Sequence, residues 1–387
     1  MNSTIKLKNE DELLLYSART HIEAHVVEKI NKLLKKDLEW GYLIELASVH
    51  SLRSLLYFQL SQTCPENVPS KIMNQLKDHY NLNARRNLLM VGELFKILKL
   101  LESKNIKAIP YKGPVLAGKT YGNLSLREFA DIDIFIDKKD MLKVKEILVS
   151  SGYLPKLKLS KEREIQYLKI QREYQFINKE SGVSVEMQWN LADISLSFPN
   201  GPVFTMNQIK THLAEINNKE FPVFSDEDLL LILSLHTVTH LWGKLLWICD
   251  IAEIVKYSDE LNWNMIMEKA RQMAIERVLY LNLDLTRELF DVKLPEVVKN
   301  KIESDNKIES LKQDVKKIIF DSENYGFMQR FFLRFRIREK RRSKIKDFIK
   351  LLIIPTSTEW EIFQKSLPLK LLFVLARPIQ IFNKTIK

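Results

Sequence analysis

Two neighbouring stretches in this 387-residue chain decide its fold: Tyr111-Lys112-Gly113-Pro114 and Arg127-Glu128-Phe129-Ala130-Asp131-Ile132-Asp133-Ile134. In the second stretch, aspartate and isoleucine alternate, which is the two-residue period of a strand with one polar face. Both aspartates therefore point to the same side of that strand. Two carboxylates placed in this way can share a hard cation such as Mg2+, which prefers oxygen ligands and keeps positions open for substrate phosphates.

A third carboxylate is expected from a neighbouring strand. Residues 174–178 and 183–189 both have strand character, and Lys179-Glu180-Ser181-Gly182 joins them as a hairpin link. In the second strand, apolar residues alternate with polar ones, and Glu186 falls on the polar face. The sequence thus predicts that Glu186 completes a metal site with the two aspartates.

The regions on either side of these strands are helical in pattern. Apolar residues recur at helical spacing through 11–103, and again from Asp226 to about Leu289. Three successive acids at 226–228 suit a helix start. The predicted fold is therefore α+β, a small mixed β-sheet core between two helical regions. Its predicted parts are an N-terminal helical region (1–103), the core (104–224), a C-terminal helical domain (225–325) and a basic amphipathic tail (326–387).

Positive charge is concentrated in that tail. The chain has 60 Lys+Arg and 49 Asp+Glu, a net charge of +11, and residues 330–350 hold ten of the bases with only two acids. Because the rest is nearly neutral, the balance argues against a protein that binds nucleic acid over its whole surface, and nucleic acid is an unlikely partner. Apolar residues are interleaved with the bases of 330–350. This pattern indicates a packed surface helix, or a site for an acidic partner, an anionic membrane surface or nucleic acid.

Composition excludes several other classes. Glycine is scarce, with 10 residues, so a kinase-type glycine-rich loop is excluded. The two cysteines, Cys64 and Cys249, can form neither a disulfide framework nor a cysteine zinc site. The N-terminus is acidic where a signal peptide would be apolar, and no apolar run reaches the ~20 residues of a membrane span. We expect a cytoplasmic protein, with a peripheral position on a membrane as the alternative.

Several residues follow one another in an order that matches a known family: Lys112-Gly113, Tyr121, Arg127, Asp131 and Asp133. This order resembles the nucleotidyltransferase superfamily with the DNA-polymerase-β-type fold, and more closely a bacterial group of uncharacterised nucleotidyltransferases. Their pattern is a strand, Lys-Gly, a short helix ending near Tyr, and Arg-x-x-x-Asp-x-Asp. Supporting matches along the chain are Glu186, Trp189, His236, His240, Trp242, Trp247, Asp250, Pro355, Trp360, Arg377 and Pro378.

Two positions depart from the family pattern. Gln188 stands where histidine is usual, and Pro114 follows Gly113 where the superfamily has serine. Proline offers neither a hydroxyl nor an N–H group. Lys112, Arg127 and the Gly113 backbone would therefore have to bind the triphosphate instead.

The resemblance implies a reaction and assigns residues to it. A nucleoside monophosphate would pass from an NTP to a hydroxyl or phosphate acceptor on a small molecule, sugar or peptide, and pyrophosphate would leave. Asp131, Asp133 and Glu186 would be the catalytic residues and would hold Mg2+, or Mn2+ in its place. The implied nucleotide- and phosphate-binding residues are Lys112, Gly113, Arg127, His240, Lys244 and Asp250. Polysaccharide or modified-peptide biosynthesis is the usual context of this group.

Two other functions stay open at this point. A glycosyltransferase also uses Asp-x-Asp to hold a metal on a nucleotide-sugar, and could act on a peptide or phosphate acceptor. It normally has about a hundred residues of alternating strands and helices before that motif, whereas residues 11–103 are helical in pattern. The other alternative is an inactive scaffold whose basic tail binds a partner. Outside the motif, we expect Trp242, Trp247 and Trp263 to pack in the core.

Overall fold

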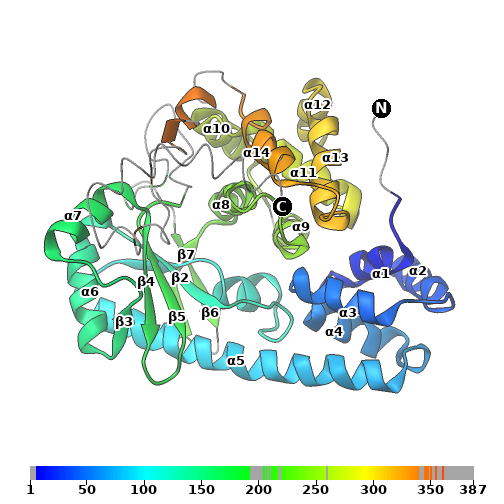
Figure 1. The fold of residues 1–387 in the computed structure, drawn as a ribbon, viewed down its shortest axis with the longest axis horizontal. Helices are drawn as coiled ribbons and strands as arrows, with labels where there is room; N and C mark the ends of the chain where they lie inside the picture. Colours follow the sequence, from blue (N-terminus) through cyan, green and yellow to red (C-terminus); the bar gives the residue numbers. More distant parts are fainter. Residues whose placement is uncertain are drawn as a thin grey trace.

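One long helix, α5 (Ser70–Glu102), lies beneath most of the molecule (Figure 1). Its 33 residues span about 50 Å. The N-terminal helices lie along its first half and the sheet lies along its second half. The computed structural model describes residues 6–191, 204, 206, 209, 211–216, 219–258, 260–339, 344–347, 349–350, 354 and 360.

The N-terminal region is helical, as predicted, but it is more divided than the apolar pattern indicates. The helical spacing that runs through 11–103 is interrupted between Ser17 and Ala24, and again at Ser51, whose φ is +58°. Neither break is marked by glycine or proline, which are the usual signals. The helices before α5 are α1 (Asn9–Ser17), α2 (Ala24–Leu34), α3 (Trp40–Val49), α4 (Arg53–Thr63) and the short turn η1 (Pro65–Asn67).

The central sheet has five strands in the order β1-β2-β5-β4-β3. β2 and β5 are parallel neighbours, and the other pairs are antiparallel. This mixed sheet between helical regions confirms the predicted α+β class. Its strands are β1 (Ala108–Pro110), β2 (Asp131–Ile136), β3 (Tyr153–Pro155), β4 (Glu173–Asn178) and β5 (Ser184–Gln188).

Several elements of the core were not expected from the sequence. β3 follows directly on helix α6 (Met141–Ser150), and α7 (Lys161–Ile170) lies between β3 and β4. A separate antiparallel hairpin follows the sheet, formed by β6 (Thr211–Ile216) and β7 (Lys219–Phe224). Short helical turns, η2 (Leu116–Thr120) and η3 (Lys138–Asp140), lie before and after β2, and the first of them is the short helix ending near Tyr121 that the family pattern implied.

The alternation in β2 separates two hydrophobic cores. Ile132, Ile134 and Ile136 pack toward α5 and α6 in one core. On the opposite face, Phe135 packs with Tyr111 and Phe224 in a larger core that also contains the N-terminal and C-terminal helices. Asp131 and Asp133 lie on this second face, ahead of Phe135. The strand period thus directs both carboxylates toward the C-terminal helices.

The C-terminal helices cover that face of the sheet. Ser225 caps the first of them by accepting a hydrogen bond from the Asp228 N–H at 3.2 Å, as the acidic start predicted. The helices are α8 (Asp226–Thr239), α9 (Leu245–Tyr257), α10 (Trp263–Met273), α11 (Glu276–Phe290), α12 (Glu296–Ser304), α13 (Ile308–Phe320) and α14 (Phe327–Arg336). The N-terminal and C-terminal helices share one hydrophobic core. The division of the chain into four parts stays a prediction.

Part of the basic segment is used within the molecule. Arg334 donates to the Thr239 carbonyl, Arg336 pairs with Asp314, and buried Arg338 pairs with Asp347 at 2.9 Å. Much of 340–387 lies outside the described residues, including Pro355, Arg377 and Pro378. Trp360 is described, and it is buried against Tyr167 with ring centroids 5.4 Å apart. Within the described chain, no helix is long and apolar enough to cross a membrane.

Buried His50 joins three parts of the larger core. Its Nδ1 accepts the Leu245 backbone N–H at 3.2 Å, so Nε2 carries the proton and donates to the Ile319 carbonyl, also at 3.2 Å. Burial lowers the pKa of His50 from 6.5 to about 4. Since the unfolded chain takes up this proton at higher pH than the folded chain, acidification favours unfolding.

We therefore expect His50 to make stability depend on pH between about 6.5 and 4. The free energy of unfolding should fall by about 2 kcal/mol between pH 7 and pH 5 from this residue alone. Urea unfolding of wild type and His50→Gln at both pH values measures this contribution. Glutamine can form both hydrogen bonds without titrating, so the variant should lose that part of the pH dependence. Equal pH dependence in the two proteins would contradict the prediction.

Candidate active site

A pocket of about 290 Å3 lies between the sheet and the helices α8 and α9. Eight of the nine residues that the sequence singled out line it. They are Lys112, Gly113, Arg127, Asp131, Asp133, Glu186, His240 and Lys244. The ninth, Asp250, was expected to line the same cleft. It lies instead behind Arg127 and is fully buried.

The carboxylates come together through the parallel pairing of β2 and β5. Asp133 and Glu186 are register partners on these strands. The Gln188 side-chain amide connects them, since its Nε2 donates to Asp133 Oδ1 at 3.0 Å and to Glu186 Oε2 at 2.9 Å. The Tyr111 hydroxyl donates to Gln188 Oε1 and so determines which end of the amide faces the acids. Glutamine at this position therefore orients two of the three carboxylates.

The pocket holds more negative charge than its own cations neutralise. Lys112 Nζ pairs with Asp133 Oδ1 at 2.8 Å. Burial, together with the neighbouring acids, nevertheless raises the pKa of Asp131 and of Glu186 above the usual carboxyl range. Although burial alone would lower it, the charge of Asp133 raises the pKa of Lys112. A further cation in this pocket would thus be electrostatically favoured.

The donor set fits a hard divalent cation in its chemistry. Asp131, Asp133 and Glu186 offer only carboxylate oxygens, which are the ligands that Mg2+ and Mn2+ prefer. In the conformation described, Lys112 and Gln188 occupy oxygens of Asp133, and Gln175 donates to Glu186 at 2.7 Å. No three His, Cys, Asp or Glu residues of the described chain converge as a ready metal cluster. Cation binding would therefore exchange some of these contacts for metal bonds.

Gly113 allows the backbone to turn close to the aspartates. Its φ is +49°, a region that favours glycine, and a Cβ at this position would lie 2.8 Å from the Asp131 carbonyl oxygen. The Tyr111 N–H donates to the Asp133 carbonyl at 3.3 Å, which extends the pairing of β1 and β2 up to this turn. The turn thereby holds Lys112 over the carboxylates.

Replacing Gly113 by alanine is expected to lower stability by about 2–3 kcal/mol and to displace Lys112. Gly122→Ala is the matched control, because Gly122 has φ +65° but a Cβ added there would meet no atom within 4 Å. This control should lose only about 1 kcal/mol, the cost of the left-handed backbone. Urea unfolding of both variants measures the difference. Equal losses would show that the close approach to Asp131 is unimportant.

Arg127 is held from behind by a buried acid. Its Nε and Nη2 donate to the two oxygens of Asp250, each at 2.8 Å, and the Tyr121 hydroxyl donates to Asp250 at 2.7 Å. Although burial opposes it, the charge of Asp250 raises the pKa of Arg127. The guanidinium is therefore charged and fixed in orientation at the edge of the pocket.

The segment that carries Arg127 is held by the N-terminal helices. On α5, Asn87 donates to the carbonyls of Leu124 and Arg127 at 2.6 and 2.9 Å. Glu128 accepts the Ser54 N–H of α4 at 3.0 Å and also contacts His79 of α5 at 3.1 Å. The conformation of this side of the pocket thus depends on residues more than thirty positions earlier in the chain.

Several residues of the pocket were not predicted from the sequence. On β4, Glu173 and Gln175 lie on the same face as Glu186, and Arg172 immediately precedes them. The alternation in 173–178 could have indicated the first two. Trp247 was expected in the core, but it is only partly buried and lines the pocket with His236 and His240. Trp242 is fully buried, as expected, and Trp263 packs partly buried against the core.

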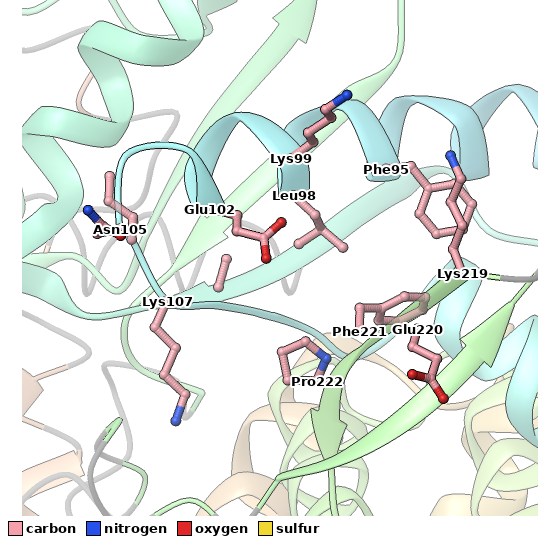
Figure 2. Close-up of a pocket in the computed structure, with 12 residues that line it drawn as sticks. Phe95, Leu98, Lys99, Glu102, Asn105, Lys107, Lys219, Glu220, Phe221 and Pro222 are labelled. Carbon is pink, nitrogen blue, oxygen red and sulfur yellow. The ribbon is translucent and has the colours of Figure 1, made fainter.

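A second and larger cavity lies away from these residues. It measures about 800 Å3 and is formed by the end of α5, the start of β1 and β7. In Figure 2, Phe95 and Phe221 lie next to each other at one end of it, with ring centroids 5.9 Å apart, and Lys219 lies over the Phe95 ring. None of the predicted site residues lines this cavity.

The pocket combines paired aspartates, a third acid on the neighbouring parallel strand, and Lys-Gly in the preceding turn. The chain matches the family model described as uncharacterised nucleotidyltransferase over residues 36–291. It therefore belongs to this family and is a nucleotidyltransferase. None of the curated proteins compared with the chain matches it.

Two solved structures are similar to parts of the chain. One is the lincosamide antibiotic adenylyltransferase LnuA with lincomycin bound, at 21% identity and a TM-score of 0.30, covering 43% of this chain and 97% of that chain. The other is an antigenic nucleotidyltransferase-like protein from Paracoccidioides brasiliensis, at 16% identity and a TM-score of 0.33, covering 56% of this chain and 96% of that chain. At these scores, neither likeness carries an argument about the site.

Proposed function

We propose that this pocket transfers a nucleoside monophosphate from an NTP to a hydroxyl or phosphate group of an acceptor, with Mg2+ or Mn2+ as cofactor. One observation carries the proposal. Three acids from two parallel strands line the same small pocket as a lysine and an arginine, each of which has its own buried partner. This combination can bind both a divalent cation and a triphosphate.

Asp131, Asp133 and Glu186 would hold the cation. When bound, the cation offsets phosphate charge and lowers the energy of the transition state for attack at phosphorus. Lys112 and Arg127 contribute fixed positive charge at the same phosphates, and the Gly113 turn lets backbone approach them. Arg127 keeps its orientation throughout, because Asp250 binds two of its nitrogens.

In the proposed reaction, the acceptor is the nucleophile. The acceptor oxygen forms a bond to the α-phosphorus, and the bond from that phosphorus to the α–β bridging oxygen breaks. Pyrophosphate leaves with the electrons of the broken bond. Where the acceptor is a hydroxyl, its proton passes to Glu186, which lies beside Asp133 on the neighbouring strand.

One feature of the fold disfavours the alternative of glycosyl transfer. Enzymes that use Asp-x-Asp on nucleotide-sugars place alternating strands and helices before the motif. In this chain, the described residues from 6 to 107 contain helices α1–α5 and no strand. The acceptor could be a small molecule, a sugar or a peptide.

A thermal-shift screen of the full-length protein tests the proposal. The ligands are the four NTPs, UDP-glucose and GDP-mannose, each with Mg2+, Mn2+ or EDTA. We expect at least one NTP to raise the unfolding temperature by a few degrees with a divalent cation, and less with EDTA. Stabilisation by nucleotide-sugars alone would favour glycosyl transfer. The absence of any cation-dependent shift would overturn the proposed active site.

A further inference from the structure

The pocket wall opposite the carboxylates is aromatic. His236 and His240 have ring centroids 4.5 Å apart, and Trp247 lies 5.0 and 5.1 Å from them. All three side chains line the same pocket as Lys112 and Asp131. Trp247 belongs to none of the hydrophobic core clusters of the described chain.

The position of this aromatic wall is imposed by an unusual turn. Leu241 and Trp242, between α8 and α9, have φ values of +51° and +50°, which are uncommon for residues other than glycine. Burial of the Trp242 ring, and the bond from its Nε1 to Asn282 at 2.8 Å, hold the turn in place. Such strain persists only where the surroundings impose it, and it is concentrated at functional sites. The turn brings His240 and Trp247 from two helices to one surface.

We infer that this wall, with Trp247 as its main surface, stacks against the nucleobase of the NTP. The inference rests on the proposed function and assigns a binding role to residues that it does not use. Aromatic rings suit a planar base, and stacking tolerates any base because each has a π face. The rings lie close to the groups proposed to bind phosphate, as a nucleotide requires.

The charge state of His236 agrees with this assignment. Burial lowers its pKa well below the ordinary value, and the positive charges of Lys112, Arg172 and Arg127 lower it further. The ring is therefore neutral at physiological pH and offers one donor and one acceptor nitrogen. Because His236 is neutral, the phosphates are left to Lys112 and Arg127, and the base to the aromatic wall.

Titration calorimetry of full-length wild type, Trp247→Leu and Trp247→Phe tests the inference. The probes are the NTP selected by the thermal-shift screen and inorganic tripolyphosphate, each with Mg2+. Tripolyphosphate has the phosphates but neither ribose nor base. We expect Trp247→Leu to weaken NTP binding about 10- to 100-fold and to leave tripolyphosphate binding unchanged. Trp247→Phe keeps an aromatic face and should retain most of the affinity.

The outcomes separate this inference from the function on which it rests. NTP binding by Trp247→Leu at wild-type strength would overturn the inference alone, as would equal weakening of NTP and tripolyphosphate. If wild type bound no NTP with Mg2+, the proposed function would fail and the inference with it. Should Trp247→Leu not fold, His240→Ala provides the second test. His240 is exposed at the end of α8, and its loss should weaken NTP binding selectively.

Discussion

Asp133→Asn is expected to reduce nucleotidyl transfer by about a thousandfold or more, with little effect on folding. The substitution removes the charge of the most buried of the three acids and preserves its shape. It takes away a proposed metal ligand, which is also the ion-pair partner of Lys112, the lysine proposed to bind the phosphates. Losses of several kcal/mol in transition-state stabilisation are usual for such groups.

Stability should change by no more than about 1 kcal/mol in this variant. Lys112 remains within reach of the charges of Asp131 and Glu186, which also raise its pKa. At the same time, repulsion among the acids decreases, because Asp133 is one cause of the raised pKa of Asp131. Asp133→Asn should therefore lose activity without losing stability, whereas a residue with a purely structural role would lose both together.

Pyrophosphate release from the selected NTP, with Mg2+, measures the activity of this variant. Asp137→Asn is the matched control. It lies just after the same strand and pairs with Lys139, but it does not line the pocket. The control should keep wild-type activity. Wild-type activity in Asp133→Asn would contradict the proposed site, whereas equal losses in both variants would point to a general effect on β2.

Asp250→Asn is expected to destabilise the protein by about 3–5 kcal/mol. The Arg127 side chain is almost fully buried, and so is Asp250, so the substitution leaves a buried charge without its counterion. The asparagine can accept through one oxygen only, whereas Asp250 accepts from Arg127 through both of its oxygens. Urea unfolding measures the loss. A change below about 1 kcal/mol would show that water or another group compensates Arg127.

Two further variants distinguish the structural role of this pair from its role at the pocket. Tyr121→Phe removes only the hydroxyl that donates to Asp250, and should cost about 1 kcal/mol. The double variant Arg127→Met with Asp250→Leu replaces the buried ion pair by apolar side chains, which is often nearly neutral for stability. We expect it to recover most of the stability but not the activity, because it removes the guanidinium proposed to bind the phosphates.

The alternation of polar and apolar residues in the sequence predicted the strands that form the carboxylate site. Alternation in 131–136 and 183–189 predicted both strands and the face that carries the acids. It did not show that β2 and β5 are parallel neighbours, which makes Asp133 and Glu186 register partners. Parallel pairing depends on the intervening crossover, which includes α6, α7 and two further strands.

Other features depend on tertiary contacts that no local pattern reports. Asp250 lies on an apolar helix, and only the fold shows that it accepts from Arg127 and does not face the pocket. Trp247 was expected in the core because its neighbours are apolar. The left-handed residues Leu241 and Trp242 change the orientation of α9 relative to α8, so a helical period carried through 226–289 assigns Trp247 to the wrong environment.

The contacts between the segment at Arg127 and helices α4 and α5 have a consequence for the engineering of this enzyme. A shortened enzyme that begins at the first strand would lose Ser54, His79, Asn83 and Asn87, which all bind the backbone or side chains of 124–128. Such a truncation would keep every acid of the site and Asp250, but it would release the backbone that carries Arg127. Random mutagenesis should accordingly find inactive variants among helix residues that never meet a nucleotide.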